Sequence, residues 1–372
     1  MSTTEIPSTM RAQFLDSYNA PFALRTAPVP APTDPHDLLI KVDAASYCHT
    51  DAVLAAGAMP PHPPAFPHVC SHEFAGTIVR AGPAAPADLQ PGVPVGVPGR
   101  SLHPCGTCFE CAASPRFDAD PPGYSVDCPS ASNNGISAHG GFREYAVVDA
   151  RQVAPVPPAL SPVETAPLMC AGVTVYAAIL KSGVRKGQRL GIMGCGGGLG
   201  HLGLQFATKM GLRVTGVDAA DGPLALAKGL DTGADVVDAR KEKAEEVRRR
   251  LGKEDGKELL GEMGLDAVII LPESQQAFDY GVDMLKNHAK CVVVSFPQKG
   301  FQVSAFSVVF RDITVVGSLV GSNKTLREML AFAAEHNVKA VLRTYPLSKL
   351  NELVEEYHKG SGGKLVVDMS LE

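Results

Sequence analysis

Four cysteines lie close together in a Pro- and Gly-rich part of the chain: Cys105, Cys108, Cys111 and Cys128. The first three are separated by two residues each, a spacing that lets thiolates turn toward one centre. Four thiolates complete the closed tetrahedral shell of a structural zinc site. Because the chain opens without the basic and apolar regions of a secretory signal, we expect reduced thiols that bind metal, not a disulfide framework.

A second set of metal-binding side chains is scattered along the chain. Cys48 opens the run CHTD, His72 is followed by Glu73, and Cys170 comes much later. Two thiolates and one imidazole form an open zinc site, whose fourth position takes water or substrate. Zinc lowers the pKa of bound water from 15.7 to about 7, roughly 12 kcal/mol, so an alcohol could ionise there and give up hydride. Each cysteine alone is more often a buried small residue, but the combination favours a catalytic metal.

A glycine-rich turn, GCGGGLGHLG from Gly194 to Gly203, follows a short apolar run and opens into a helical pattern. Glycines let the backbone approach a pyrophosphate, and the N–H groups at the start of the helix stabilise its charge. Asp218 follows about twenty residues later, where an acidic side chain accepts hydrogen bonds from the adenosine ribose. A carboxylate there repels a 2′-phosphate, so the pattern predicts NAD and disfavours NADP.

Composition limits the remaining possibilities. The chain has 372 residues, more than usually fold around one hydrophobic core, which predicts two domains. A formal net charge of -5 offers no basic field for nucleic acid or anionic lipid. Apolar runs are only strand-length, so we expect no membrane span and a cytoplasmic location.

The elements that position these residues change in character near residue 161. Before it, short β-type runs alternate with turns, at 37–42, 74–79 and 142–148. After it, helical and strand patterns alternate, which predicts an α/β fold with a doubly wound parallel sheet. Strands are expected at 189–194, 213–218, 234–238, 265–271, 289–296, 312–319 and 363–369, and helices at 163–180, 199–210, 324–336 and 347–358.

Taken together and in order, these motifs resemble the zinc-containing alcohol dehydrogenases of the medium-chain dehydrogenase/reductase superfamily, with the yeast-like fungal branch the nearest. The resemblance includes APLMCAGVTVY at 166–176, VGSLVG at 316–321 and GKLVVD at 363–368. It implies a GroES-like β-rich catalytic domain at 1–171, a Rossmann domain at 172–315 and a C-terminal segment at 316–372 that returns to the first domain. A structural zinc lobe would occupy about 100–130, and strand pairing near Val316 would form a homodimer, either alone or within a homotetramer.

The resemblance also implies roles in the reaction. The Cys₂His ligand set is the one that alcohol dehydrogenase itself uses. Three residues would hold the catalytic zinc, with Glu73 as an alternating or near ligand: Cys48, His72 and Cys170. Asp51 would orient His72, and Thr50 would take the proton from the bound alcohol.

Two zinc ions per chain and NAD(H) are the implied cofactors. His49 would face the pyrophosphate, and Thr174 would line the nicotinamide pocket. The remaining cofactor contacts would come from the glycine turn and the following strand: Gly197, Gly198, Leu199, Gly200 and Asp218.

Three departures from the family pattern concern the reaction, the substrate pocket and the structural zinc lobe. Val53 replaces a histidine that relays protons, and relays of this kind contribute up to about 10²- to 10⁴-fold. The segment 99–104 lacks the bulky aromatic side chain that covers small alcohols, so we expect a wider pocket. Sixteen residues, Ala112–Asp127, separate the last two structural cysteines where about seven are usual. An inert surface loop is the simpler interpretation of this excursion, and a contribution to an entrance or subunit contact is the alternative.

The resulting hypothesis is a zinc-dependent oxidoreductase that transfers hydride between NAD(H) and a primary or secondary alcohol or its aldehyde or ketone, with the substrate oxygen on zinc. Two alternatives remain open. One is a C=C (enoyl-type) reductase of the same superfamily, whose members usually lack the zinc ligands. The other is a catalytically silent module that binds NAD and zinc and senses redox state.

Overall fold

The computed structural model describes residues 6–59, 63 and 65–371, which form two compact units. Unit 1 contains Met1–Val173, Gly321–Lys359 and Lys364–Glu372, and unit 2 contains Thr174–Val320 and Gly360–Gly363. The borders lie two and five residues beyond the expected ones at 171 and 315. Within the described ranges, no single helix is long and apolar enough to cross a membrane. One bent pair, Pro162–Met169 with Ala171–Ser182, has the combined length and composition of a span.

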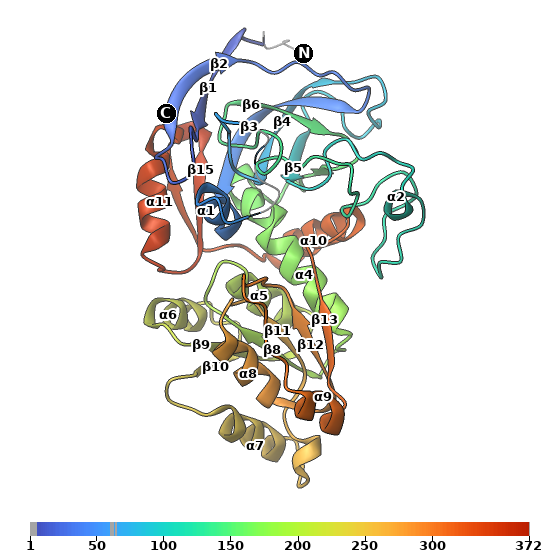
Figure 1. Ribbon diagram of the computed structural model, residues 1–372, viewed down its shortest axis with the longest axis vertical. Coiled ribbons are helices and arrows are strands. Elements are labelled where there is room, and N and C mark those ends of the chain that lie inside the picture. The colour runs from blue at the N-terminus through green and yellow to red at the C-terminus, as the bar shows by residue number, and fades with distance from the viewer. Residues whose placement is uncertain (1–5, 60–62, 64, 372) are drawn as a thin grey trace. The chain divides into compact units, whose positions relative to one another are not determined.

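Unit 2 is built on a six-stranded sheet in which every neighbouring pair is parallel (Figure 1). Its strands are β8 (Arg189–Met193), β9 (Arg213–Asp218), β10 (Asp235–Asp238), β11 (Leu265–Ile270), β12 (Leu285–Val293) and β13 (Thr314–Gly317). The spatial order β10-β9-β8-β11-β12-β13 reverses direction between β8 and β11. This is the strand order of the Rossmann fold, which places ligands at the carboxyl ends beside the reversal. The predicted doubly wound sheet is therefore confirmed.

The strands of unit 2 form because both faces of the sheet are covered. All five residues of β8 are buried, as expected for parallel strands between helical layers. The helices of the unit are α5 (Gly200–Lys209), α6 (Asp221–Gly229), α7 (Ala244–Glu254), α8 (Gln275–Asp283) and α9 (Ala305–Arg311). Helix α7 buries Val247 and Leu251 and exposes most of its charged residues, so it presents a solvated face.

Unit 1 is rich in β structure. Its main sheet has the order β14-β15-β3-β4-β5-β7, and β6 pairs with β3. The strands are β3 (Asp37–Tyr47), β4 (Glu73–Ala81), β5 (Pro94–Pro98), β6 (Tyr145–Asp149), β7 (Ala154–Pro155), β14 (Leu342–Tyr345) and β15 (Lys364–Asp368), and β1 (Thr9–Phe14) pairs with β2 (Ala23–Pro28) in a separate hairpin. Strand β15 comes from the end of the chain and pairs antiparallel with β3, so the C-terminal segment completes this sheet.

The helices of unit 1 are short, apart from two near the C-terminus. They are α1 (His49–Ala55), α2 (Phe109–Ala113), α3 (Pro162–Thr165), α10 (Asn323–His336) and α11 (Leu350–His358), with 3₁₀ turns at Ala166–Met169, Leu347–Lys349 and Met369–Leu371. The helix α4 (Ala171–Ser182) begins in unit 1 and continues into unit 2.

The continuous helix expected at 163–180 is wrong. The structure has α3, a 3₁₀ turn and α4 in succession, and Cys170 lies between the last two with φ -125° and ψ -65°. These angles lie outside the α-helical region, so the helix ends and restarts at this cysteine.

Candidate active site

Four side chains of unit 1 meet in one cluster: Cys48, His72, Glu73 and Cys170. One donor atom of each, a sulfur, an imidazole nitrogen or a carboxylate oxygen, lies within 4.8 Å of all the others. Cys48 sits between β3 and α1, and His72 directly precedes β4. The fold thus brings together residues up to 122 positions apart that the sequence pattern had selected for one metal.

Asp51 connects two parts of this cluster. Its Oδ2 atom accepts a hydrogen bond from the backbone N–H of Cys48 at 2.9 Å, which also caps α1. Its Oδ1 atom accepts the N–H of Ser71 at 2.9 Å and lies 3.5 Å from Nδ1 of His72. Asp51 is buried, so this carboxylate fixes the backbone of both segments and orients the imidazole.

The Nε2 atom of His72 is buried and has no hydrogen-bond partner among the described residues. Such an orphaned nitrogen is costly unless something else binds it. Two thiols and a carboxylate surround it, the donor set that zinc prefers, so the residues present fit a zinc ion.

The two thiols of the cluster titrate as a coupled pair. The sulfur of Cys170 lowers the pKa of Cys48 well below its usual value, with help from Lys364 and His72. The sulfur of Cys48 and burial raise the pKa of Cys170 well above its usual value. Two buried thiolates repel each other, so a metal cation that binds both removes this conflict.

Glu73 is bound on both carboxylate oxygens. Oε1 pairs with Nζ of Lys364, which is buried and also donates to the carbonyl oxygen of Tyr47 at 3.2 Å, and Oε2 accepts the N–H of Ala171 at 3.4 Å. Burial raises the pKa of Glu73 to about 7, against the opposing effect of Lys364. The sequence interpretation missed Lys364 as part of this site, although its motif, GKLVVD, had been noted.

The four clustered cysteines form a second group of donors. Their sulfurs also lie within 4.8 Å of one another, and all four thiols are free. The sulfur of Cys128 lies 3.7 Å from that of Cys105 and 4.0 Å from that of Cys108, too far for a disulfide bond. Backbone N–H groups of Thr107 and Cys108 lower the pKa of Cys105 to about 6, which favours the thiolate that zinc requires.

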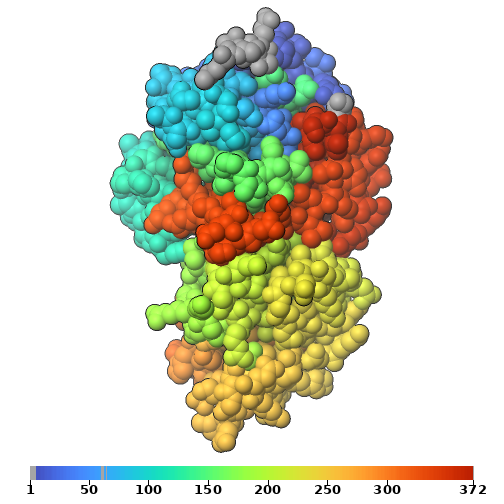
Figure 2. Space-filling view, turned by 180° about the vertical axis from the view of Figure 1, so that it is seen from behind, coloured from blue at the N-terminus to red at the C-terminus, as the bar shows by residue number. Residues whose placement is uncertain are grey.

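The excursion Ala112–Asp127 is not an inert surface loop. Arg116 pairs with Asp118 and, at 2.9 Å, with Asp127. Asp118 and Asp120 both accept hydrogen bonds from residues at the start of α10. In Figure 2 the teal atoms of the cysteine lobe accordingly abut the orange-red atoms of the segment that contains α10. The excursion therefore joins the cysteine lobe to the C-terminal part of unit 1.

In unit 2 the glycine turn connects the end of β8 to the start of α5. No side chain caps α5. The carboxylate of Asp218, at the end of β9, accepts the N–H of Gly196 at 3.1 Å, so this residue lies beside the turn. A Cβ atom added at Gly197 would meet only the carbonyl oxygen of Gly194, at 3.4 Å. The open space above Gly197 and the uncapped helix start fit the phosphates of a dinucleotide.

The remaining candidate residues lie on α1 and α4. Thr50 is half-buried, and Val53 occupies the same helix. Nδ1 of His49 lies 2.8 Å from the hydroxyl of Tyr357 on α11, a partner that no sequence motif indicated. The Oγ1 atom of Thr174 is buried and has no hydrogen-bond partner among the described residues, so this hydroxyl is available to a ligand.

Pro- and Gly-rich surroundings predict exposed turns for four histidines, His62, His68, His103 and His139, and one of them is buried. His68 is 1% exposed, and its Nε2 atom lies 3.2 Å from the carbonyl oxygen of Gly135. His139 is exposed, as expected, although its Nδ1 atom accepts the N–H of Val69; partial desolvation and the nearby charge of Arg143 lower its pKa to about 4. His103 reaches the buried carboxylate of Asp37 at 2.6 Å. His62, the fourth histidine of this group, lies outside the described residues.

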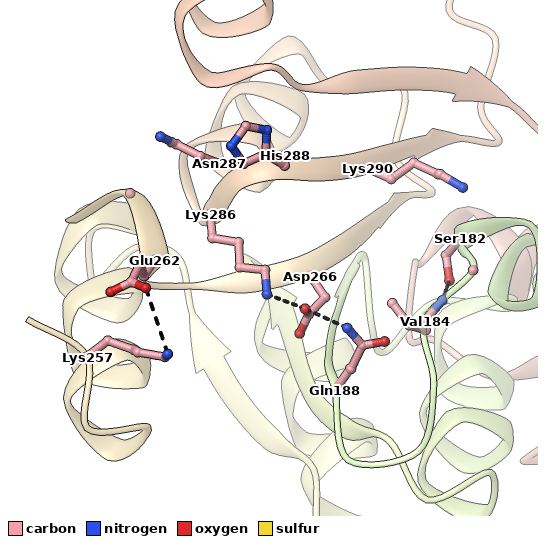
Figure 3. A pocket seen from close by; sticks show the side chains of 12 residues that line it. Ser182, Val184, Gln188, Lys257, Glu262, Asp266, Lys286, Asn287, His288 and Lys290 are labelled. Atoms are coloured by element: carbon pink, nitrogen blue, oxygen red, sulfur yellow. Dashed lines mark hydrogen bonds and ion pairs between the residues drawn. The ribbon is translucent and has the colours of Figure 1, made fainter. Parts of the chain in front are cut away.

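A cavity of about 500 Å³ lies in unit 2 at the amino ends of β11 and β12 (Figure 3). Its lysines already have partners: Lys286 pairs with Asp266, Lys257 lies 4.0 Å from Glu262, and Lys290 donates to a backbone carbonyl at 3.0 Å. The glycine turn follows the carboxyl end of β8, at the opposite edge of the sheet. We therefore assign no ligand to this cavity.

Comparison with known proteins decides the family. Residues 34–158 match the family described as alcohol dehydrogenase GroES-like domain, and residues 198–335 match zinc-binding dehydrogenase. An alcohol dehydrogenase of Rhizobium meliloti is 35% identical over 97% of this chain and 99% of its own length. The chain belongs to the zinc-containing alcohol dehydrogenases. Alcohol dehydrogenase 1 of Neurospora crassa is 33% identical over all of both chains, so fungal members of the family are among its relatives.

Solved alcohol dehydrogenase structures have the same architecture. The enzyme from Aeropyrum pernix superposes with a TM-score of 0.81 at 26% identity, covering 96% of this chain and 99% of its own. A zinc-binding dehydrogenase from Sinorhizobium meliloti, solved with NADP, gives 0.81 at 26% identity, covering 97% and 100%. As a zinc-containing alcohol dehydrogenase, the chain is a zinc-dependent alcohol oxidoreductase that uses a nicotinamide cofactor. The alternatives of a C=C reductase and of a silent module are not favoured.

Proposed function

We propose that this enzyme transfers hydride between NAD(H) and a primary or secondary alcohol or its carbonyl partner, with Cys48, His72 and Cys170 holding a catalytic zinc ion. In the direction of reduction, the carbonyl compound, NADH and one proton give the alcohol and NAD⁺. The observation that carries the assignment is the orphaned Nε2 atom of His72 between two free thiols. When bound, the zinc supplies Lewis acidity and the nicotinamide supplies or accepts the hydride.

The chain's own residues hold and orient the reacting groups. Through its contact with Nδ1, Asp51 would keep the Nε2 atom of His72 directed at the bound metal, and Thr50 would take the alcohol proton. Lys364 balances the charge of Glu73. Both carboxylate oxygens of Glu73 already have protein partners, so we propose that Glu73 is an alternating or near ligand of the zinc. With valine at position 53, we expect water to carry the proton onward from Thr50.

The cofactor preference is proposed from unit 2. His49 would contact the pyrophosphate, and Thr174 would line the nicotinamide pocket. Asp218 would accept hydrogen bonds from the ribose. The other contacts come from the glycine turn: Gly197, Gly198, Leu199 and Gly200. A carboxylate at position 218 favours NAD because it repels a 2′-phosphate. A second zinc, held by the four clustered cysteines, would have a closed thiolate shell and so a structural role.

We also infer a homodimer that forms through β13, either alone or as half of a homotetramer. This strand is an edge of the sheet of unit 2, and edge strands with apolar side chains tend to pair. Phe306, Val309 and Phe310 on the neighbouring α9 are 66–71% exposed, an apolar surface suited to a second copy. Sedimentation equilibrium tests this, and a monomer at micromolar concentration would contradict it. The nine free thiols suit the reducing cytoplasm that we propose as its compartment.

The decisive experiment counts zinc per chain and follows NADH consumption with a panel of aldehydes. Two zinc ions with turnover support the proposal. Turnover that persists after the labile zinc has been removed would instead indicate a C=C reductase, and one zinc without turnover would indicate a silent module.

A further inference from the structure

Arg100 leaves the main sheet of unit 1 directly beside a zinc-ligand candidate. Strand β5 ends at Pro98, which pairs with Glu73 in the antiparallel register, so the next residue, Gly99, runs alongside His72. The approach is close, because a Cβ atom at Gly99 would lie 2.5 Å from the Cβ atom of His72. The side chain of Arg100 therefore starts one residue from this contact.

The backbone around Arg100 is held in place. The hydroxyl of Tyr124, in the excursion, lies 3.5 Å from the carbonyl oxygen of Arg100. The next residue, Ser101, has a φ of 58°, donates its N–H to Asn133 at 3.3 Å and donates its hydroxyl to Ser125 at 2.7 Å. A fixed backbone limits where the guanidinium can reach.

The guanidinium of Arg100 has no hydrogen bond or ion pair among the described residues, although the side chain is half-buried. Burial lowers the pKa of Arg100, although the negative charges of Asp127 and Cys170 act to raise it. Asp127 is already paired with Arg116. A partly desolvated cation without a partner is unfavourable, and a bound anion offsets this cost.

We propose that Arg100 binds a carboxylate on the substrate, so that the enzyme acts on carbonyl compounds bearing an acid group and on the corresponding hydroxy acids. This rests on the proposed function, since the reacting carbonyl must lie at the site formed by His72 and Cys170. Lys364, the other cation whose charge acts on Cys170, is already paired with Glu73, which leaves Arg100 to recognise the acid. A guanidinium matches a carboxylate with two parallel hydrogen bonds. The carboxylate itself does not react; hydride from NADH forms the new C–H bond.

The test compares 4-oxobutanoate with its methyl ester, which has the same chain without the charge. The wild-type enzyme should favour 4-oxobutanoate in kcat/KM by about 10- to 100-fold, the range of a charge-assisted pair. Arg100→Met, which keeps the aliphatic stem, should abolish the preference mainly through KM, because kcat/KM falls far more for the acid than for the ester. Arg100→Lys should restore part of it, and Arg80→Met, which removes an exposed cation of β4, should change nothing.

Each outcome decides one question. Equal kcat/KM values for acid and ester in the wild type, or a preference that survives in Arg100→Met, would overturn the inference while turnover upholds the proposed function. No turnover of any aldehyde by the zinc-loaded enzyme would overturn the proposed function itself. If 3-oxopropyl phosphate is preferred over 4-oxobutanoate and Arg100→Met removes that preference, the site binds phosphate and the carboxylate assignment is wrong.

Discussion

Oδ2 of Asp118 lies 3.0 Å from the backbone nitrogen of Ser322, 204 residues further along the chain. Ser322 is the N-cap of α10, and the same carboxylate oxygen also accepts the hydroxyl of Thr325 at 3.1 Å. Asp120 accepts the next two N–H groups of this helix, at 2.9 and 2.8 Å. Two carboxylates thus satisfy N–H groups that a helix start leaves unpaired, and they favour its positive end.

Replacing Asp118 with Asn should destabilise unit 1. The amide keeps one acceptor but loses the charge that binds Arg116, so we expect a loss of about 1–3 kcal/mol in the free energy of unfolding. Urea denaturation followed by circular dichroism measures this. The control is Asp88→Asn, which removes only a half-exposed ion pair with Arg327 and should cost less than about 1 kcal/mol. Equal losses in both variants would show that the excursion does not stabilise α10.

Asp51→Asn should weaken zinc binding at the cluster of Cys48 and His72. The amide cannot accept hydrogen bonds with both terminal atoms, so either Cys48 or Ser71 loses its partner and the imidazole loses its orientation. Losing such support typically costs 10- to 100-fold in metal affinity or activity. Competition with a chromophoric chelator measures the affinity, and Asp43→Asn, which disturbs only a bond to Thr77, is the control. Unchanged affinity in Asp51→Asn would contradict the orienting role.

Substitutions in the two cysteine groups should differ in their effects on melting temperature and on activity. Cys170→Ser should remove one zinc and nearly all activity, with little change in melting temperature, because an open site contributes little to folding. Cys128→Ser should remove the other zinc and lower the melting temperature, because a closed thiolate shell contributes directly to folding. Metal analysis with differential scanning calorimetry tests both. If Cys170→Ser lowers the melting temperature more than Cys128→Ser, the two roles are reversed.

A carboxylate in unit 2 predicts a pH-dependent contribution to stability. Hydrogen bonds from Arg189 and Arg213 lower the pKa of Asp255 to about 2, against about 3.9 in an unfolded chain. Because the unfolded state takes up the proton first, this stabilisation is complete above about pH 4 and is lost as the pH falls toward 2. The carboxylate is partly exposed, so the contribution is about 1 kcal/mol or less.

Asp255→Asn should therefore lower the melting temperature at pH 7, and the difference from the wild type should shrink by pH 3. Acid loss of zinc affects both proteins alike and cancels in this difference. Glu258→Gln, at an exposed position in the same unit, should match the wild type at both pH values. A difference that stays constant down to pH 3 would rule out the linkage.

Much of the fold could be predicted from the sequence, because buried parallel strands are short apolar runs that alternate with helical patterns. The strand at 213–218 was predicted to the residue, since its limits are set by local composition. The two candidate metal sites could be selected because few types of side chain bind zinc, and the structure brings the donor atoms of each set together. The break at Cys170 was not predictable, as one residue with non-helical angles inside an apolar run leaves no compositional trace.

Contacts between residues far apart in the sequence were also not predicted. Nothing in the local pattern of Asp118 or Tyr357 indicates the residues that they contact, 204 and 308 positions away. His68 was expected in an exposed turn because prolines surround it, but the strand pairing around Leu15 and the carbonyl of Gly135 bury it. These contacts depend on how the sheet closes, which no single segment encodes.

Two adjacent glycines offer a matched test of the nucleotide site. A Cβ atom at Gly196 would lie 1.9 Å from the carbonyl oxygen of Pro223, whereas one at Gly197 would meet only an oxygen at 3.4 Å. Gly196→Ala should therefore destabilise unit 2, and Gly197→Ala should melt close to the wild type. If a pyrophosphate lies over the turn, the methyl group at 197 would displace it, and we expect NADH to bind about 10-fold or more weakly by fluorescence titration. Wild-type NADH affinity in a stable Gly197→Ala enzyme would mean that the phosphates bind elsewhere, because the protein itself leaves room for that methyl group.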